Sequence, residues 1–191
     1  MAHFAISELM ISLAALWAAR LLWSHQLCWA AFGVLVFGAA AAIGVIRFPA
    51  GLIEEWAAMH RWAGTMGGVL AMQALTQQLI KSDTSAYRLH LGLAIIALGV
   101  AMALPWTRVP LFLVWSLAFI WRVSAATPEI AVSKFMKGCI AGLMLFNVIV
   151  FRQSPFMAPA VSWHIFHVLL ALWILGLGRL FVHPHLLAKP A

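Results

Sequence analysis

The chain has 191 residues, of which 65% are hydrophobic and only 9% are charged, and its mean hydropathy is +1.00. Soluble domains carry about 25% charged residues, so this composition excludes a soluble globular protein. The net charge of +7 comes from Lys and Arg residues scattered singly at the ends of apolar blocks. There is no basic run with a stacking platform, so we expect no nucleic-acid partner.

The apolar residues gather in blocks of about 20, the length that a helix needs to cross a hydrocarbon core about 30 Å thick. Each block predicts a helix, because only helices satisfy their own backbone groups at membrane depth. In chain order we expect about seven, over residues 5–23, 28–47, 57–80, 86–106, 109–123, 136–152 and 160–182. The prediction is an all-α polytopic membrane helical bundle that forms a single transmembrane domain over residues 1–191.

The junctions between blocks carry residues that punctuate helices. Pro49 follows the second block, and Pro105 and Pro110 bracket a tight turn between the fourth and the fifth. Thr84 or Ser85 is placed to cap the fourth helix, because a hydroxyl before the first turn accepts a hydrogen bond from a free backbone N–H.

The basic residues also predict the orientation of the chain. If the N-terminus is outside, the inner ends of the blocks hold eight Lys and Arg residues and the outer ends hold four. The four at the outer ends are Arg47, Arg61, Arg108 and Arg152. The positive-inside rule therefore favours an integral membrane protein with its N-terminus outside and its C-terminus cytoplasmic, and we expect the bacterial inner membrane.

This orientation places several polar side chains in one layer near the outer face. Glu8 lies near the outer end of the first block among apolar residues, where an unpaired carboxylate is costly. Arg47 ends the second block at the same level. We therefore predict an ion pair between Glu8 and Arg47, either structural or substrate-binding.

Histidines reach the same layer. His60 begins the third block, and His164 and His167 open the seventh at a spacing that puts both on one helical face. Two imidazoles on one face, with a third ligand from another helix, suit zinc and a bound water acidified for hydrolysis. We take His60, His164 and His167 as candidate zinc ligands, although a histidine at the end of a span often binds only water or backbone.

Haem b is the rival cofactor. Bis-His ligation needs one histidine from each of two helices at a common depth. On the outer side His60 with His164 or His167 would serve, and on the inner side His90 with a histidine of the C-terminal tail. The chain would then be a haem-binding or non-catalytic subunit of a larger membrane protein complex, with protein partners in the membrane.

Three short segments carry a family resemblance. Residues 162–168 (Ser-Trp-His-Ile-Phe-His-Val) look like a Ser-His-Gln-x-Phe-His-Val run, and residues 44–48 (Gly-Val-Ile-Arg-Phe) look like a Gly-x-x-His motif that ends a second span. Glu8 matches an acidic residue in a first span. With about seven spans, these segments resemble the alkaline ceramidase-like superfamily of membrane hydrolases, which includes the progestin and adipoQ receptors.

The resemblance implies a hydrolase of lipid amides that binds a membrane lipid and holds zinc with three histidines. This chain departs from the family at two of the three ligand positions, where it has Arg47 and Trp163, and only His167 matches. A guanidinium keeps its proton and cannot bind a metal. In an inactive version of the family site, Arg47 would replace the metal and the cavity would bind a lipid or serve a partner.

In an active version, the zinc would be held by His167, His164 and His60. Glu8, which matches the acid of the first span, and Ser162, which matches the serine that opens the seventh, would be the catalytic residues.

Overall fold

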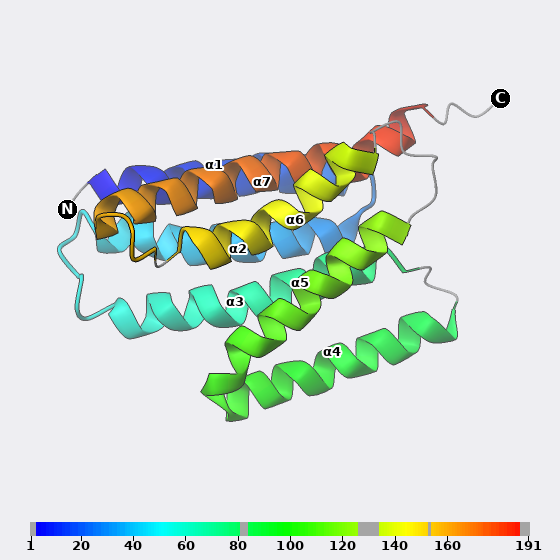
Figure 1. The fold of residues 1–191 in the computed structure, drawn as a ribbon, viewed down its shortest axis with the longest axis horizontal. Helices are drawn as coiled ribbons and strands as arrows, with labels where there is room; N and C mark the ends of the chain where they lie inside the picture. Colours follow the sequence, from blue (N-terminus) through cyan, green and yellow to red (C-terminus); the bar gives the residue numbers. More distant parts are fainter. Residues whose placement is uncertain (1–2, 81–83, 126–133, 153, 188–191) are drawn as a thin grey trace.

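The computed structural model describes residues 3–80, 84–125, 134–152 and 154–187 (Figure 1). Within these ranges the chain forms seven α-helices, one 3-10 turn and no strand, which confirms the predicted all-α bundle. The elements are α1 (His3–Ser24), α2 (Cys28–Arg47), α3 (Ala57–Gln78), α4 (Ser85–Ala103), η1 (Pro105–Thr107), α5 (Arg108–Ala125), α6 (Lys134–Val150) and α7 (Pro159–Leu187).

Five described segments are long and apolar enough to cross a membrane, as an integral membrane protein requires. They are α1, α2, α4, α7 and the continuous segment of η1 and α5. The helix α6 is apolar but has only 17 residues, and α3 has 22 residues but a more polar composition.

The polar residues of α3 are used for packing. Gln73 donates through Nε2 to the carbonyl oxygen of Ala94 in α4 at 3.1 Å. Oε1 of Gln78 accepts from the backbone N–H groups of Trp29 and Ala30, at 3.1 and 3.2 Å, at the start of α2. The first N–H groups of a helix have no partner within it, so α3 supplies the cap that α2 lacks. The start of α4 has its own cap, because the hydroxyl of Thr84 accepts from the N–H of Tyr87.

Six of the helices form a closed ring. Going round it, α1 packs against α2, α2 against α3, α3 against α5, α5 against α6, α6 against α7, and α7 against α1. The helix α4 lies outside this ring, against α3, as Figure 1 shows. Because the helices alternate in direction, one end of the ring gathers the first turns of α1, α3, α5 and α7 with the last turns of α2 and α6. We call this the site end of the bundle.

Small residues bring the ring helices close together. A Cβ atom at Gly38 of α2 would lie 2.6 Å from the Cβ of Ala15 in α1, so the backbone of α2 packs directly against that side chain. Helices in membranes associate through such close contacts of small side chains. Farther from the site end, the interior is filled by larger groups such as Phe119, Trp173 and Leu177, each fully buried.

The outer surface is apolar. Only Ala97 and Ala101 are buried in α4, whereas its large side chains, including Leu89, Ile95 and Ile96, point outward and are 64–66% exposed. Such a surface suits contact with lipid and leaves polar chemistry to the inside of the ring.

Candidate functional site

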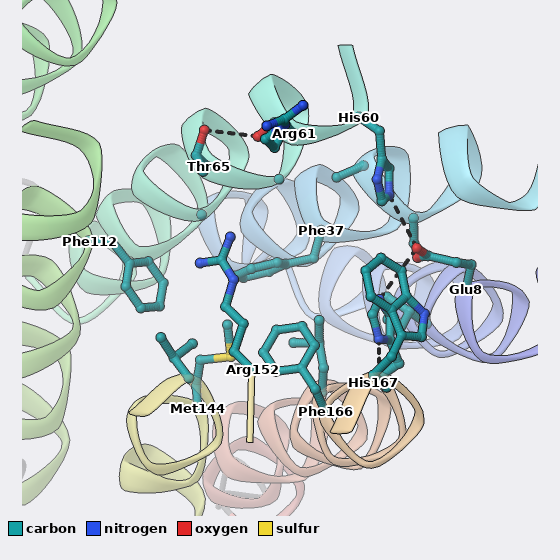
Figure 2. A pocket seen from close by; sticks show the side chains of 18 of the residues that line it. Glu8, Phe37, His60, Arg61, Thr65, Phe112, Met144, Arg152, Phe166 and His167 are labelled. Atoms are coloured by element: carbon teal, nitrogen blue, oxygen red, sulfur yellow. Dashed lines mark hydrogen bonds and ion pairs between the residues drawn. The ribbon is translucent and has the colours of Figure 1, made fainter. Parts of the chain in front are cut away.

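Four helices of the ring meet at one carboxylate. Glu8 lies in the second turn of α1 and is 1% exposed. Its Oε1 is 3.1 Å from Nε2 of His60 in α3 and 3.3 Å from Nε2 of His167 in α7 (Figure 2). On α2 the neighbour is Gly44, where a Cβ atom would lie 2.6 Å from Cδ of Glu8. The glycine thus makes the room that the carboxylate occupies.

Arg47 determines which nitrogen of His60 carries the proton. NH1 of Arg47 lies 3.3 Å from Nδ1 of His60, and its Nε donates to the carbonyl oxygen of Ile53 at 2.8 Å. A guanidinium only donates, so Nδ1 of His60 must accept. The proton of the neutral ring is therefore on Nε2, the nitrogen that faces Glu8.

His167 has the opposite arrangement, with a proton on Nδ1. Its Nδ1 lies 2.7 Å from the carbonyl oxygen of Trp163, one turn earlier in α7. A carbonyl only accepts, so Nδ1 of His167 carries a proton. Either Nε2 is also protonated and the imidazolium pairs with the carboxylate of Glu8, or Glu8 holds that proton and faces the lone pair of Nε2. Both arrangements place one proton between the two residues and have the same total charge.

Oε1 of Glu8 also has unused capacity to accept hydrogen bonds. Its contacts with the two rings have the length of ion pairs, but neither is aligned as a hydrogen bond. A buried acceptor without an aligned donor is costly, so this oxygen is suited to a donor supplied by water or a ligand.

These donors do not fit a zinc ion. Nε2 of His60 is protonated because Nδ1 accepts from Arg47, and a protonated nitrogen has no lone pair for a metal. Across the described residues, no group of three or more His, Cys, Asp or Glu side chains is arranged to hold a metal. His164 lies apart from the Glu8 contacts: its Nδ1 is 3.2 Å from Oγ of Ser7, and its ring stacks on Phe4. The three predicted zinc ligands are therefore not brought together.

The predicted direct ion pair between Glu8 and Arg47 is not formed, because His60 lies between them. The residue of α2 that is level with Glu8 is Gly44, and Arg47 lies almost one turn farther along. At that position a loop carbonyl, that of Ile53, holds the guanidinium.

Ser162, the second candidate catalytic residue, does not line the cavity described below. It is 4% exposed, and its hydroxyl donates to the carbonyl oxygen of Phe151 in the connection between α6 and α7. The helix α7 already begins at Pro159, so Ser162 lies within the helix and ties its first turn to the preceding connection.

Of the haem candidates, His60 and His167 both contact Glu8 at the site end, whereas His164 contacts Ser7. His90 lies near the start of α4, outside the ring, with its ring edge-on to Trp115 at 4.8 Å between centroids. That start follows the end of α3 remote from His60, so the two histidines lie at opposite ends of the bundle. The tail histidines, His183 and His185, are outside the residues whose side chains the structure describes.

A cavity of about 270 Å³ lies inside the ring at the site end. Residues from all six ring helices, or directly next to them, line it, and α4 contributes none. Glu8, His60 and His167 form part of one wall (Figure 2). The apolar wall includes Ile11, Phe37, Phe112, Met144, Phe166 and Leu170.

Three arginines complete the lining, namely Arg61, Arg108 and Arg152. Nε of Arg108 donates to the carbonyl oxygen of Ala101 at 3.0 Å. Arg152 follows α6, and Figure 2 shows its guanidinium in the middle of the cavity, between Phe37 and Phe112. Surrounding protein atoms partly desolvate Arg152 and lower the pKa of its guanidinium, although the residue as a whole remains exposed. The group remains charged.

Aromatic rings cover the polar wall. Trp163 stacks on His167 with 4.3 Å between centroids, and Phe4 and Phe48 meet the indole edge-on at 5.7 and 5.9 Å. Trp163 is one of the lining residues, but its indole N–H is itself buried and has no hydrogen-bond partner among the described residues.

The structure brings together Glu8, His60 and His167, which the sequence placed at one level. Sequence reasoning missed Arg61, Arg108, Arg152 and Trp163 as site residues. The three arginines share the level of Glu8 at the outer ends of the blocks, but for them this signal was used only to predict orientation. Comparison of the chain with protein-family models, with curated proteins and with solved structures finds no match.

Proposed function

We propose that this integral membrane protein binds a membrane lipid in the cavity at the site end of its bundle. The cavity itself supports the proposal: it is enclosed by six helices, its wall is mostly apolar, and a few polar groups converge on it. Small-molecule sites in proteins have this composition. The volume of about 270 Å³ is just below the usual range of about 300–1,000 Å³, so the cavity suits a headgroup or one end of a lipid.

A lipid has a route into the cavity. Gly64 of α3 and Val109 of α5 line it and are exposed, and no heavy atom lies within 4 Å of a Cβ built at Gly64. The opening therefore lies between the site ends of two packed helices. A lipid bound there would place its polar part against Glu8, His60 and His167 and leave the rest of its chain outside.

Hydrolysis of the bound lipid is the second candidate function, favoured by the proton shared between Glu8 and His167. A carboxylate and an imidazole that exchange one proton at a cavity wall can accept a proton from water and return it to a leaving group. Because the donors do not fit zinc, this version assigns the acid–base role to Glu8 and His167 themselves.

We also propose the orientation with the site end outside, because it keeps the larger number of basic residues on the cytoplasmic side. In a bacterial inner membrane the cavity would then take its lipid from the outer leaflet.

Native mass spectrometry of the detergent-purified protein tests lipid binding. We expect one lipid to remain bound to the wild type. Gly64→Trp places a large side chain in the cavity mouth and should remove the bound lipid. The matched control is Gly99→Trp, because Gly99 lies on the exposed face of α4 and a Cβ built there also meets no heavy atom within 4 Å. A folded Gly64→Trp protein that keeps its lipid would refute the proposal.

Hydrolysis has a separate test. Mass spectrometry would follow release of fatty acid from an amide-linked lipid, with the wild type and Glu8→Gln compared in the same detergent. The hydrolase version predicts release that the substitution abolishes, and absence of release from the wild type would rule it out for that lipid class.

A further inference from the structure

We infer that the group bound inside the cavity is an anion, a phosphate or a carboxylate, held by Arg61, Arg108 and Arg152. The inference rests on the proposed lipid-binding function and adds the charge class of the ligand. A lipid headgroup and a free phosphate share this chemistry, and the experiment below separates them.

The first argument is uncompensated charge. Among the described residues, salt bridges form only between Glu8 and the two histidines, and none involves the three arginines. Of the described residues that line the cavity, Glu8 alone is acidic. Whichever of Glu8 and His167 holds their shared proton, that pair is neutral overall. The three guanidinium charges therefore have no carboxylate to balance them.

The second argument is unused donors. Within the described structure, the side chains of Arg61 and Arg152 make no hydrogen bond, and Arg108 uses only its Nε. A guanidinium carries five N–H donors in a planar fork that matches the oxygens of phosphate or carboxylate. Arg47 is the contrast, because Ile53 and His60 engage its donors and it does not line the cavity.

The third argument is the position of these arginines and, for Arg152, the direction of its side chain. An arginine that serves only to orient the chain in the membrane can extend into the headgroup layer around the bundle. Arg61, Arg108 and Arg152 belong to three separate segments, at the starts of α3 and α5 and just after α6, yet all three line the same cavity. Figure 2 shows that Arg152 points toward its centre.

The neutral lining favours the same class of ligand. The rings of Phe37, Phe112 and Phe166 provide an apolar surface beside the guanidinium groups. A cation is excluded by repulsion, and a wholly apolar molecule would leave the donors unpaired at a cost of about 1–3 kcal/mol each.

The test measures binding of defined probes to the delipidated full-length protein by native mass spectrometry. The probes are phosphatidylglycerol, phosphatidylcholine with the same acyl chains, and inorganic phosphate. We expect phosphatidylglycerol to bind at least tenfold more tightly than phosphatidylcholine, with an affinity that falls as salt is raised. Inorganic phosphate should bind more weakly, because it gains nothing from the apolar wall.

Matched variants test whether binding of phosphatidylglycerol depends on the arginines. Arg61→Gln, Arg108→Gln and Arg152→Gln should each weaken phosphatidylglycerol binding about tenfold, and Arg152→Lys should lose less because it keeps the charge. Arg20→Gln is the control, since Arg20 is exposed and does not line the cavity, and it should change binding less than twofold. Thermal unfolding of each variant establishes that it is folded.

The outcomes separate the two proposals. Equal binding of both phospholipids, unaffected by the arginine variants, would overturn the anion inference and leave lipid binding intact. Phosphate that binds as tightly as phosphatidylglycerol, and depends on the arginines, would support the anion site and identify a free anion as its ligand. Loss of all lipid binding would remove the proposed function itself.

Discussion

Glu8 shows how a costly side chain becomes part of the architecture. A carboxylate within a membrane helix needs a partner or a proton, and here it contacts a histidine on each of two other helices and a glycine on a third. Its position in the first span made it the clearest anomaly of the sequence. The identity of its partners depends on helix rotation, which the sequence does not specify.

Removing this carboxylate should loosen the bundle. We expect Glu8→Ala to lower the free energy of unfolding by about 1–3 kcal/mol, because half-buried His60 and buried His167 lose the carboxylate that their Nε2 atoms contact. Glu8→Gln should lose much less, since its amide oxygen can accept from His60 while its NH2 group donates to neutral His167. Thermal unfolding in detergent measures both, with Glu54→Ala in an exposed loop as control. Equal stability of all three variants would show that the contacts contribute nothing.

The room for the carboxylate can be tested at Gly44. A Cβ atom at this position would lie 2.6 Å from Oε1 of Glu8, so Gly44→Ala forces the carboxylate away from the two imidazoles. We expect lower stability, although alanine ordinarily favours a helix by about 1 kcal/mol over glycine. In a double-mutant cycle, the change should cost little once Glu8 is alanine. If Gly44→Ala lowered stability equally in the wild-type and Glu8→Ala backgrounds, the clash would not involve Glu8.

Sequence reasoning recovered part of the site, for identifiable reasons. Residue level follows from position along a span, so Glu8, His60 and His167 were placed together. His164 precedes His167 by three residues, or 300° around the helix, and the remaining 60° directs it to Ser7 and Phe4 instead of the cavity. Two residues three positions apart share a helical face only approximately, and packing determines which of the two side chains faces the cavity.

At the scale of helices, prediction was more complete. The observed helices follow the predicted blocks to within a few residues, because block length is set by the membrane rather than by neighbours. The helix α3 is a case in which the sequence predicted the helix but not its contacts. Its glutamines lower its hydropathy, and only the structure shows that Gln73 and Gln78 are used by α4 and by the start of α2. Helix order in the ring was not predictable, because contacts between alanines and glycines carry little partner-specific information.

Two glycines in different settings test how the ring is packed. Gly38→Ala would place its Cβ 2.6 Å from that of Ala15 and should lower the unfolding temperature by separating α1 from α2. Gly142→Ala meets no heavy atom within 4 Å on the surface of α6, so it should preserve or slightly raise that temperature. Both variants are compared with wild type in the same detergent. Similar shifts for the two variants would contradict the close packing of α1 on α2.

At the scale of the whole molecule, orientation is the main prediction that remains open to experiment. With Cys28 and Cys139 replaced by serine, a single cysteine at Glu54, between α2 and α3 at the site end, should react with a membrane-impermeant maleimide in intact cells. A cysteine at Gln26, between α1 and α2 at the opposite end, should react only after the membrane is permeabilised. The reverse pattern would place the cavity on the cytoplasmic side.

The contact between α1 and α7 has a consequence for biosynthesis. The ring is closed by the contact of α1, the first of its helices to leave the ribosome, with α7, the last of them. No intermediate that lacks α7 therefore contains the finished cavity. Until α7 is inserted, Glu8 lacks its contact with His167, and α1 lies in the bilayer with a carboxylate that is missing this partner. A chaperone or insertase that shields α1 during this interval would protect the nascent chain, and truncation before α7 should lead to rapid degradation.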